Sequence, residues 1–254
     1  MWELVLGLVL VLLLFISVRR RRPLPLDPAS TVLLVIAHPD DETMFFAPTI
    51  RALTAAGHRT FVLCISTGDF YGLGQIRKPE LRRAAVELGL SQSDVTILDH
   101  HAFRDGSMWD ARRLGDLIMQ HTETLSINTI VTFDAHGVSG HHNHTACFNA
   151  VQHAYTHSHV PEHVQIFVLD SVSVCRKYLG LWDSVFSCNQ SPFCYVARLR
   201  DVGACWRAMR AHYTQLVWFR RLYIVFSRYV YMNNLRRIAP IDLIAAKFNK
   251  SKTE

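Results

Sequence analysis

The sequence predicts an α/β fold: a Rossmann-like, mostly parallel sheet with helices on both faces, preceded by one N-terminal transmembrane helix. Three observations predict it. Short apolar runs rich in β-branched residues recur along the chain, which is typical of buried parallel strands. Helical stretches separate these runs, and such alternation is typical of βαβ units. A long apolar run opens the chain.

Five apolar runs are the expected strands. Each is short and continuous, as suits a strand that is covered on both faces. The expected strands are residues 31–37, 60–66, 95–98, 129–133 and 165–169. We expect ligands to bind beyond their carboxyl ends, as in other open α/β sheets.

The stretches between these runs are the expected helices, at residues 43–56, 79–88 and 109–124. Gly57 and Gly89 follow the first two, and glycine is common just past a helix end. We place the catalytic domain at residues 31–196. No glycine-rich dinucleotide or P-loop motif is present, which argues against a nucleotide-binding version of the fold.

Residues 1–22 are predicted to be a transmembrane anchor with a basic flank. Residues 4–18 are almost entirely apolar, and with the residues before them they reach the short end of the ~17–25 residues that cross a bilayer. A cleaved signal peptide has its positive charges before the apolar run, whereas here four arginines, residues 19–22, follow it. The positive-inside rule keeps them, and the domain, in the cytoplasm. A proline-containing linker is expected at residues 23–30.

The six cysteines form no CxxC pair, and reduced thiols fit a domain that faces the cytosol. A bridge between Cys188 and Cys194 is the alternative. The net charge of +6 favours an anionic partner. Arginines next to the apolar run favour a membrane over nucleic acid, and no nucleic-acid partner is expected.

Two polar motifs directly follow expected strands. Residues 37–42 read AHPDDE, and residues 134–144 read DAHGVSGHHNH. Both therefore lie where a sheet of this class places its active site. Histidine and aspartate are common zinc ligands, so the pair of motifs predicts a metal centre.

A hydrolytic zinc site takes three protein ligands and leaves one position for water. His38 and Asp41, three residues apart across a turn, and His144 after the fourth strand are the predicted ligands. Asp40 cannot easily face the same point as Asp41, so we expect it to be the general base that accepts the proton of the attacking water. We expect His141, one helical turn before His144, to stabilise the oxyanion or protonate the leaving amine. Zn²⁺ is the expected cofactor, and Fe²⁺ accepts the same ligands.

These motifs resemble those of the LmbE-like N-acetyl-sugar deacetylases, and within them most closely those of the PIG-L branch. The resemblance covers roughly residues 31–193. It implies a Rossmann-like fold, one zinc ion and the same roles for the five residues above. It also implies a glycolipid substrate, N-acetylglucosaminyl-phosphatidylinositol (GlcNAc-PI), deacetylated in the second step of GPI-anchor biosynthesis at the cytoplasmic face of the endoplasmic reticulum. Many soluble members have aspartate where this chain has Asn143, so a role for that position in orienting the catalytic histidine is not carried over.

Two further residues are candidate substrate-binding residues. Arg77 corresponds to a family position that meets the phosphate or sugar, and the alternative is a solvated helix start. Asp134 either orients His141 without binding the metal itself or caps the loop before Gly137.

Other residues near the motifs have simpler expected roles. Glu42 is expected to be a first-turn helix residue. Five other histidines are not expected to be ligands: His136, His142, His153, His157 and His159. Glycines at 68, 72 and 74 suggest a mobile loop over the site.

The C-terminal segment, residues 197–254, is expected to be helical, because residues 213–237 interleave aromatic and basic side chains. Packing on the domain is the first interpretation, and a place in the membrane headgroup region is the second.

For the whole chain, the alternatives to the favoured function are a zinc deacetylase of another N-acyl amino sugar and a membrane-tethered scaffold without activity.

Overall fold

Seven strands form one sheet in the computed structural model, in the order β3-β2-β1-β4-β5-β7-β6. Their bounds are β1 Thr31–Ile36, β2 Arg59–Cys64, β3 Val95–Ile97, β4 Thr129–Phe133, β5 Gln165–Leu169, β6 Phe193–Val196 and β7 Met232–Arg237. The structure describes residues 22–157 and 160–238, together with the isolated positions 2, 7, 12 and 16. The first five strands are parallel, whereas β7 runs antiparallel to β5 and β6. The predicted mostly parallel α/β sheet is confirmed.

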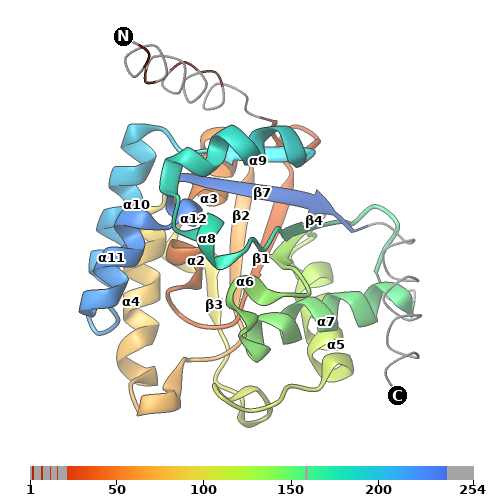
Figure 1. Ribbon diagram of the computed structural model, residues 1–254. Helices are drawn as coiled ribbons and strands as arrows, with labels where there is room; N and C mark the ends of the chain where they lie inside the picture. Colours follow the sequence, from red (N-terminus) through yellow and green to blue (C-terminus); the bar gives the residue numbers. More distant parts are fainter. Residues whose placement is uncertain are drawn as a thin grey trace, which may run out of the picture.

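Helices cover both faces of this sheet, with α4 and α10 on one side and α5 and α7 on the other (Figure 1). The longer helices are α3 Ala47–Ala55, α4 Gly74–Glu87, α5 Ala111–Thr124, α7 His142–Thr156, α9 Ser184–Gln190, α10 Leu199–Ala211 and α11 Trp218–Phe226. Single turns connect them: α2 Asp41–Met44, α6 Gly137–Gly140, α8 Val174–Lys177, α12 Arg228–Tyr231, and the 3₁₀ turns η1 Asp69–Tyr71, η2 Gln92–Asp94, η3 His101–Phe103 and η4 Gly180–Asp183. Gly115 lets α5 approach α7, because a Cβ there would lie 2.8 Å from the Ala150 carbonyl oxygen.

The helices differ from their predicted bounds in two places. The helix expected at 43–56 is two helices, α2 and α3, and the helix expected from residue 79 begins at Gly74 with Pro79 inside it. Two strands, β6 and β7, were not predicted. The expected boundary after residue 196 falls between β6 and α10, and β7 on its far side pairs with β5 and β6 in the same sheet.

The order of the strands creates the position for a site. β1 lies between β2 and β4, so the chain leaves β1 toward one side of the sheet and returns at β4 on the other. The carboxyl ends of β1 and β4 are therefore neighbours at the point where the strand order reverses, which is where ligands bind in such sheets. Both predicted motifs follow these two strands.

The predicted membrane anchor at residues 4–18 lies almost entirely outside the described residues. Among the residues that are described, no helix has the length and apolar character needed to cross a bilayer. The last residue of the predicted anchor and basic flank contacts the domain, because Arg22 forms a two-hydrogen-bond bridge with Cys194 of β6.

Candidate metal centre and catalytic site

A cavity of about 490 Å³ lies at the carboxyl ends of β1 and β4. It brings together all five residues predicted to carry the chemistry: His38, Asp40, Asp41, His141 and His144. Four of them are buried, and His141 is partly exposed.

The turn after β1 is built around the carboxylate of Asp41. Its Oδ2 accepts hydrogen bonds from the backbone N–H groups of Ala37 and His38, at 3.0 and 2.8 Å. Its Oδ1 lies 3.2 Å from Nε2 of His144, and its Oδ2 lies 3.7 Å from Nδ1 of His38. Burial favours the neutral acid, but the two histidines and the backbone hydrogen bond outweigh it and hold the pKa of Asp41 below its usual range.

Both histidines that face Asp41 are oriented from behind by a hydrogen-bond acceptor. His144 Nδ1 lies 3.0 Å from the carbonyl oxygen of Gly137, and His38 Nε2 lies 3.0 Å from Oδ1 of Asp105. A proton on each of these nitrogens leaves the lone pair of the other one free toward Asp41. This arrangement is typical of metal-ligating histidines.

The donor set fits a divalent metal ion. Two imidazole nitrogens and one carboxylate oxygen converge in a buried position, and they suit Zn²⁺ or Fe²⁺. A second, overlapping set is also present, because ring nitrogens of His38, His141 and His144 all lie within 4.8 Å of one another. The two sets share His38 and His144 and differ in Asp41 or His141 as the third ligand.

His141 is held differently from the other two histidines. It is the N-cap of α7, and its Nδ1 accepts the backbone N–H of Asn143 at 3.3 Å. The other nitrogen, Nε2, therefore carries the proton. Partial burial and the neighbouring rings of His144 and His38 lower the pKa of His141 to about 4, so the ring is neutral near pH 7. A neutral ring with an N–H at Nε2 is a hydrogen-bond donor.

Asn143 is fully buried and connects α7 to the loop that carries Asp105. Its Oδ1 lies 3.3 Å from His38 Nε2 and accepts the Gly106 N–H at 3.3 Å, and its Nδ2 donates to the Ser107 carbonyl at 2.9 Å. Asn143 therefore supports His38 and its neighbouring loop.

Asp40 lies between two guanidinium groups. Its Oδ1 is 3.4 Å from Arg77 Nη2, and its Oδ2 is 3.0 Å from Arg220 Nη2. Arg220 comes from α11, far along the chain, and also donates to the carbonyl and side-chain oxygens of Gln215. The two arginines fix the carboxylate of Asp40 on the wall of the cavity.

Arg77, a candidate substrate contact, is a buried residue that lines the same cavity. Its guanidinium donates to the carbonyl oxygens of Pro39 and Gly68 as well as pairing with Asp40. These contacts brace the turn after β1 against the loop after β2.

Asp134, the other candidate, holds the loop after β4. Its Oδ1 accepts hydrogen bonds from the backbone of His136 and Gly137 and from the Ser171 hydroxyl. Its Oδ2 accepts the Ser171 N–H at 2.8 Å. The hydrogen bonds of this carboxylate therefore go to the loop after β4 and to Ser171 after β5, as the capping interpretation expects.

Glu42 is in the first turn of α2, as expected, but it is fully buried. Its Oε1 lies 2.6 Å from Nε2 of His212, and its Oε2 accepts the Asp40 N–H at 3.1 Å. Burial opposes the charged imidazolium, but Glu42 outweighs it and raises the pKa of His212. The pair ties the segment after α10 to the first motif.

Sequence reasoning missed Asp105, Arg220 and His212. Asp105 lies in a turn after β3, with Gly106 beside it, and the only available signal was a carboxylate placed after an expected strand. Arg220 was one of several arginines in an aromatic segment. Nothing in the sequence pairs His212 with a glutamate that lies 170 residues away.

The chain is similar in sequence and fold to known proteins. Residues 33–155 match the family model described as "PIG-L: GlcNAc-PI de-N-acetylase". The chain is 44% identical over 211 residues to N-acetylglucosaminyl-phosphatidylinositol de-N-acetylase of Bos taurus, covering 81% of this chain and 83% of the relative. It is 36% identical over 222 residues to the probable enzyme of that name from Schizosaccharomyces pombe, covering 82% and 86%.

Among solved structures, N,N'-diacetylchitobiose deacetylase from Pyrococcus horikoshii has a similar fold. The TM-score is 0.60 at 15% identity, and the match covers 94% of this chain and 93% of that one. By its sequence identity to these relatives, the chain belongs to the family of GlcNAc-PI de-N-acetylases.

Proposed function

We propose that this protein is a metal-dependent hydrolase that removes the N-acetyl group from GlcNAc-PI, giving glucosaminyl-phosphatidylinositol and acetate. The observation that carries the proposal is that His38, Asp40, Asp41, His141 and His144 share one cavity in a chain 44% identical to an enzyme of that name. The reaction belongs to GPI-anchor biosynthesis, as its second step.

His38, Asp41 and His144 hold the metal ion in this proposal, with Zn²⁺ as the first candidate and Fe²⁺ as the second. Support comes from the lone pairs of the two histidines, which face Asp41, whereas the N–H of His141 faces the cavity. A divalent ion bound there lowers the pKa of water toward ~7 and polarises the amide carbonyl.

The other two residues handle protons and charge. Asp40 accepts the proton of the attacking water, because its carboxylate is fixed on the cavity wall by Arg77 and Arg220. His141 donates an N–H hydrogen bond to the oxygen that gains negative charge as the amide carbon becomes tetrahedral. The proton held by Asp40 then passes to the amine nitrogen as the C–N bond breaks, so that acetate and the free amine leave. Arg77 and Arg220 also place positive charge beside the cavity, which suits an anionic glycolipid.

The substrate is a lipid, so the protein must work at a membrane surface. We place it in the endoplasmic reticulum membrane, held by residues 4–18 with the domain in the cytoplasm. Support comes from α11, which carries Arg220 into the site and leaves Trp218, Phe219 and Leu222 exposed. An amphipathic helix with aromatic and basic residues suits the headgroup region.

The test is an assay of acetate release. Membranes that contain the full chain are incubated with GlcNAc-PI labelled in the acetyl group, with the Asp40→Asn variant as the inactive control. Labelled acetate is expected from the unmodified protein alone. Equal release from both samples, or none from either, contradicts the proposal.

A further inference from the structure

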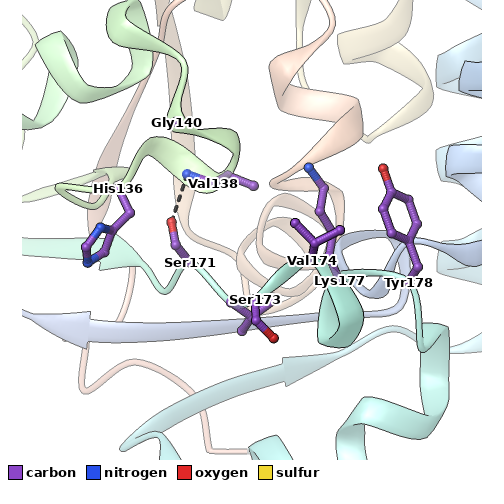
Figure 2. Close-up of a pocket in the computed structure, with 9 residues that line it drawn as sticks. His136, Val138, Gly140, Ser171, Ser173, Val174, Lys177 and Tyr178 are labelled. Atoms are coloured by element: carbon purple, nitrogen blue, oxygen red, sulfur yellow. Dashed lines mark hydrogen bonds between the residues drawn. The ribbon is translucent and has the colours of Figure 1, made fainter.

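A second cavity, of about 570 Å³, lies beside the catalytic one. The loop 136–140 after β4 lines it on one side, and residues 171–178 after β5 line it on the other. Lys177 and Tyr178 of this second segment project side by side in the same direction (Figure 2). Like the catalytic cavity, it therefore opens at the carboxyl ends of parallel strands.

The ring of Phe45, which lines the catalytic cavity, contacts a residue of each cavity. Lys177 Nζ lies 6.0 Å from its centroid, and the ring of His144 lies 5.5 Å from it in an edge-on arrangement. The loop that lines the second cavity also provides the Gly137 carbonyl that orients His144. A ligand with its amide at His144 thus needs to extend only past Phe45 to reach Lys177.

Lys177 is unusual in its surroundings. Its ammonium group lies 5.6 to 6.0 Å from the ring centroids of Phe45, Tyr178 and Tyr223. Among the described residues Lys177 forms no ion pair with a carboxylate. Burial of the ammonium group lowers the pKa of Lys177. An ammonium group in such surroundings is stabilised by an anion that enters from solvent.

The other basic side chains at the two cavities are already engaged. Arg77 and Arg220 both pair with Asp40. Of the lysine and arginine side chains that line either cavity in the described part of the chain, Lys177 is thus the one without a carboxylate partner. The cationic side chain without a carboxylate partner therefore lies in the second cavity.

We propose that the second cavity binds the phosphodiester of the glycolipid and that Lys177 is its cationic contact. This inference rests on the proposed function. In GlcNAc-PI an inositol ring separates the amino sugar from the phosphate, so the anion belongs beside the reaction site rather than in it. Lysine binds phosphate as a point charge, and the hydroxyl of the neighbouring Tyr178 offers a second donor. The phosphate contact is thereby assigned to Lys177, and Arg77 becomes a positioning residue for Asp40.

The experiment compares two substrates with four forms of the full chain in detergent micelles. The substrates are GlcNAc-PI and N-acetylglucosaminyl-inositol, which lacks the phosphate. Beside the unmodified protein, the forms are the variants Lys177→Gln and Lys177→Arg and the matched control Arg59→Gln. Arg59 begins β2, so it lies at the opposite end of the sheet, exposed and paired with Asp94. Inhibition by inositol 1-phosphate is measured as a readout that needs no turnover of the second substrate.

Lys177→Gln is expected to lower kcat/KM for GlcNAc-PI about 10- to 100-fold, mainly through KM, because a charged hydrogen bond is lost. Turnover of the phosphate-free substrate should not change, inhibition by inositol 1-phosphate should weaken by a similar factor, and Lys177→Arg should restore most of both. Equal loss on the two substrates, or unchanged inhibition, overturns the assignment of Lys177. If the unmodified protein releases no acetate from GlcNAc-PI, the proposed function itself has failed.

Discussion

Asp40 has a backbone conformation that non-glycine residues rarely adopt, with φ 118° and ψ −18°. Such strain is kept where the surrounding structure holds it, and it is concentrated at functional sites. Here the Asp40 N–H donates to Glu42, and two arginines hold its carboxylate. The strained turn separates the directions of two adjacent aspartates, so that Asp41 faces the histidines and Asp40 faces the arginines.

Asp40→Asn is expected to lower turnover by ~10²–10⁴-fold, because an amide cannot accept the proton of the attacking water. The substitution keeps the size of the side chain, so metal content should not change. Turnover of GlcNAc-PI and metal content per chain are the measurements. Asp110→Asn is the control. Asp110 is the N-cap of α5, and asparagine caps a helix as well as aspartate does. Turnover of Asp40→Asn close to that of the control would place the base elsewhere.

The two overlapping ligand sets give opposite results in two variants. If Asp41 is the third ligand, Asp41→Ala should lose the metal and His141→Ala should keep it with little activity left. If the three histidines are the ligands, the outcomes are reversed. Elemental analysis of the purified variants measures this, and His144→Ala should lose the metal in either case. Retention of metal by His144→Ala would show that the ion binds elsewhere.

At the scale of the elements, the sequence predicts the strands that carry the site and misses those that do not. β4 and β5 have the predicted bounds, because each is a continuous apolar run. β7 reads MNNLRR, which lacks that pattern. It is a strand because its asparagines are satisfied inside the fold: Asn233 accepts from Thr49 and donates to the Phe45 carbonyl, and Asn234 donates to the Ser187 carbonyl.

The site residues that were predicted are likewise those that a local sequence pattern places. His38, Asp41 and His144 lie in the two motifs that begin directly after β1 and β4, so strand prediction alone brings them together. Asp105 and Arg220 reach the site through a turn and a distant helix, and only the tertiary fold places them there. Contacts between distant segments leave no local pattern in a single sequence.

Helix α11 connects the catalytic cavity with an exposed apolar surface. One side of the helix is buried through Tyr223 and Ile224, and the other exposes Phe219, Leu222 and Phe226, each at least half exposed. Because Arg220 on this helix contacts Asp40, a bilayer that binds the exposed side would lie close to the site entrance.

Replacing Phe219 and Leu222 together by serine is expected to raise KM for GlcNAc-PI in phospholipid vesicles several-fold, because less apolar surface enters the headgroup region. The kcat/KM for a short-chain, water-soluble analogue should not change. Val86→Ser is the control, since Val86 is an exposed apolar residue on α4. Equal losses on both substrates would indicate a structural defect instead of a membrane contact.

At the scale of the whole molecule, segments from both ends of the chain complete the central domain. Two glutamates hold the segment after α10. Glu42 pairs with His212, and the carboxylate of Glu80 accepts hydrogen bonds from the backbone N–H and the hydroxyl of Thr214. At the other end of the domain, Arg22 of the predicted basic flank pairs with Cys194 of β6. The catalytic site therefore requires residues beyond 196, and the segment that leads toward the predicted anchor leaves from an edge of the sheet.

The final prediction concerns the orientation of the domain in the membrane. With the anchor at residues 4–18 and four arginines on its cytoplasmic side, protease added to sealed microsomes should digest the domain and leave a short N-terminal fragment. Asn143 and the two residues after it form a glycosylation sequon. Because Asn143 is fully buried, its lack of a glycan is expected on either side of the membrane once the protein is folded.

An exposed sequon makes the test decisive. Ser91→Asn creates one at residues 91–93, all exposed, and keeps the cap of η2, because asparagine is as good an N-cap as serine. This variant should remain unglycosylated in cells and fully active on GlcNAc-PI. A glycan at position 91, or protection of the domain from added protease, would place the domain in the lumen. The positive-inside assignment of the anchor would then be wrong, and GlcNAc-PI would have to reach the site from the lumenal leaflet.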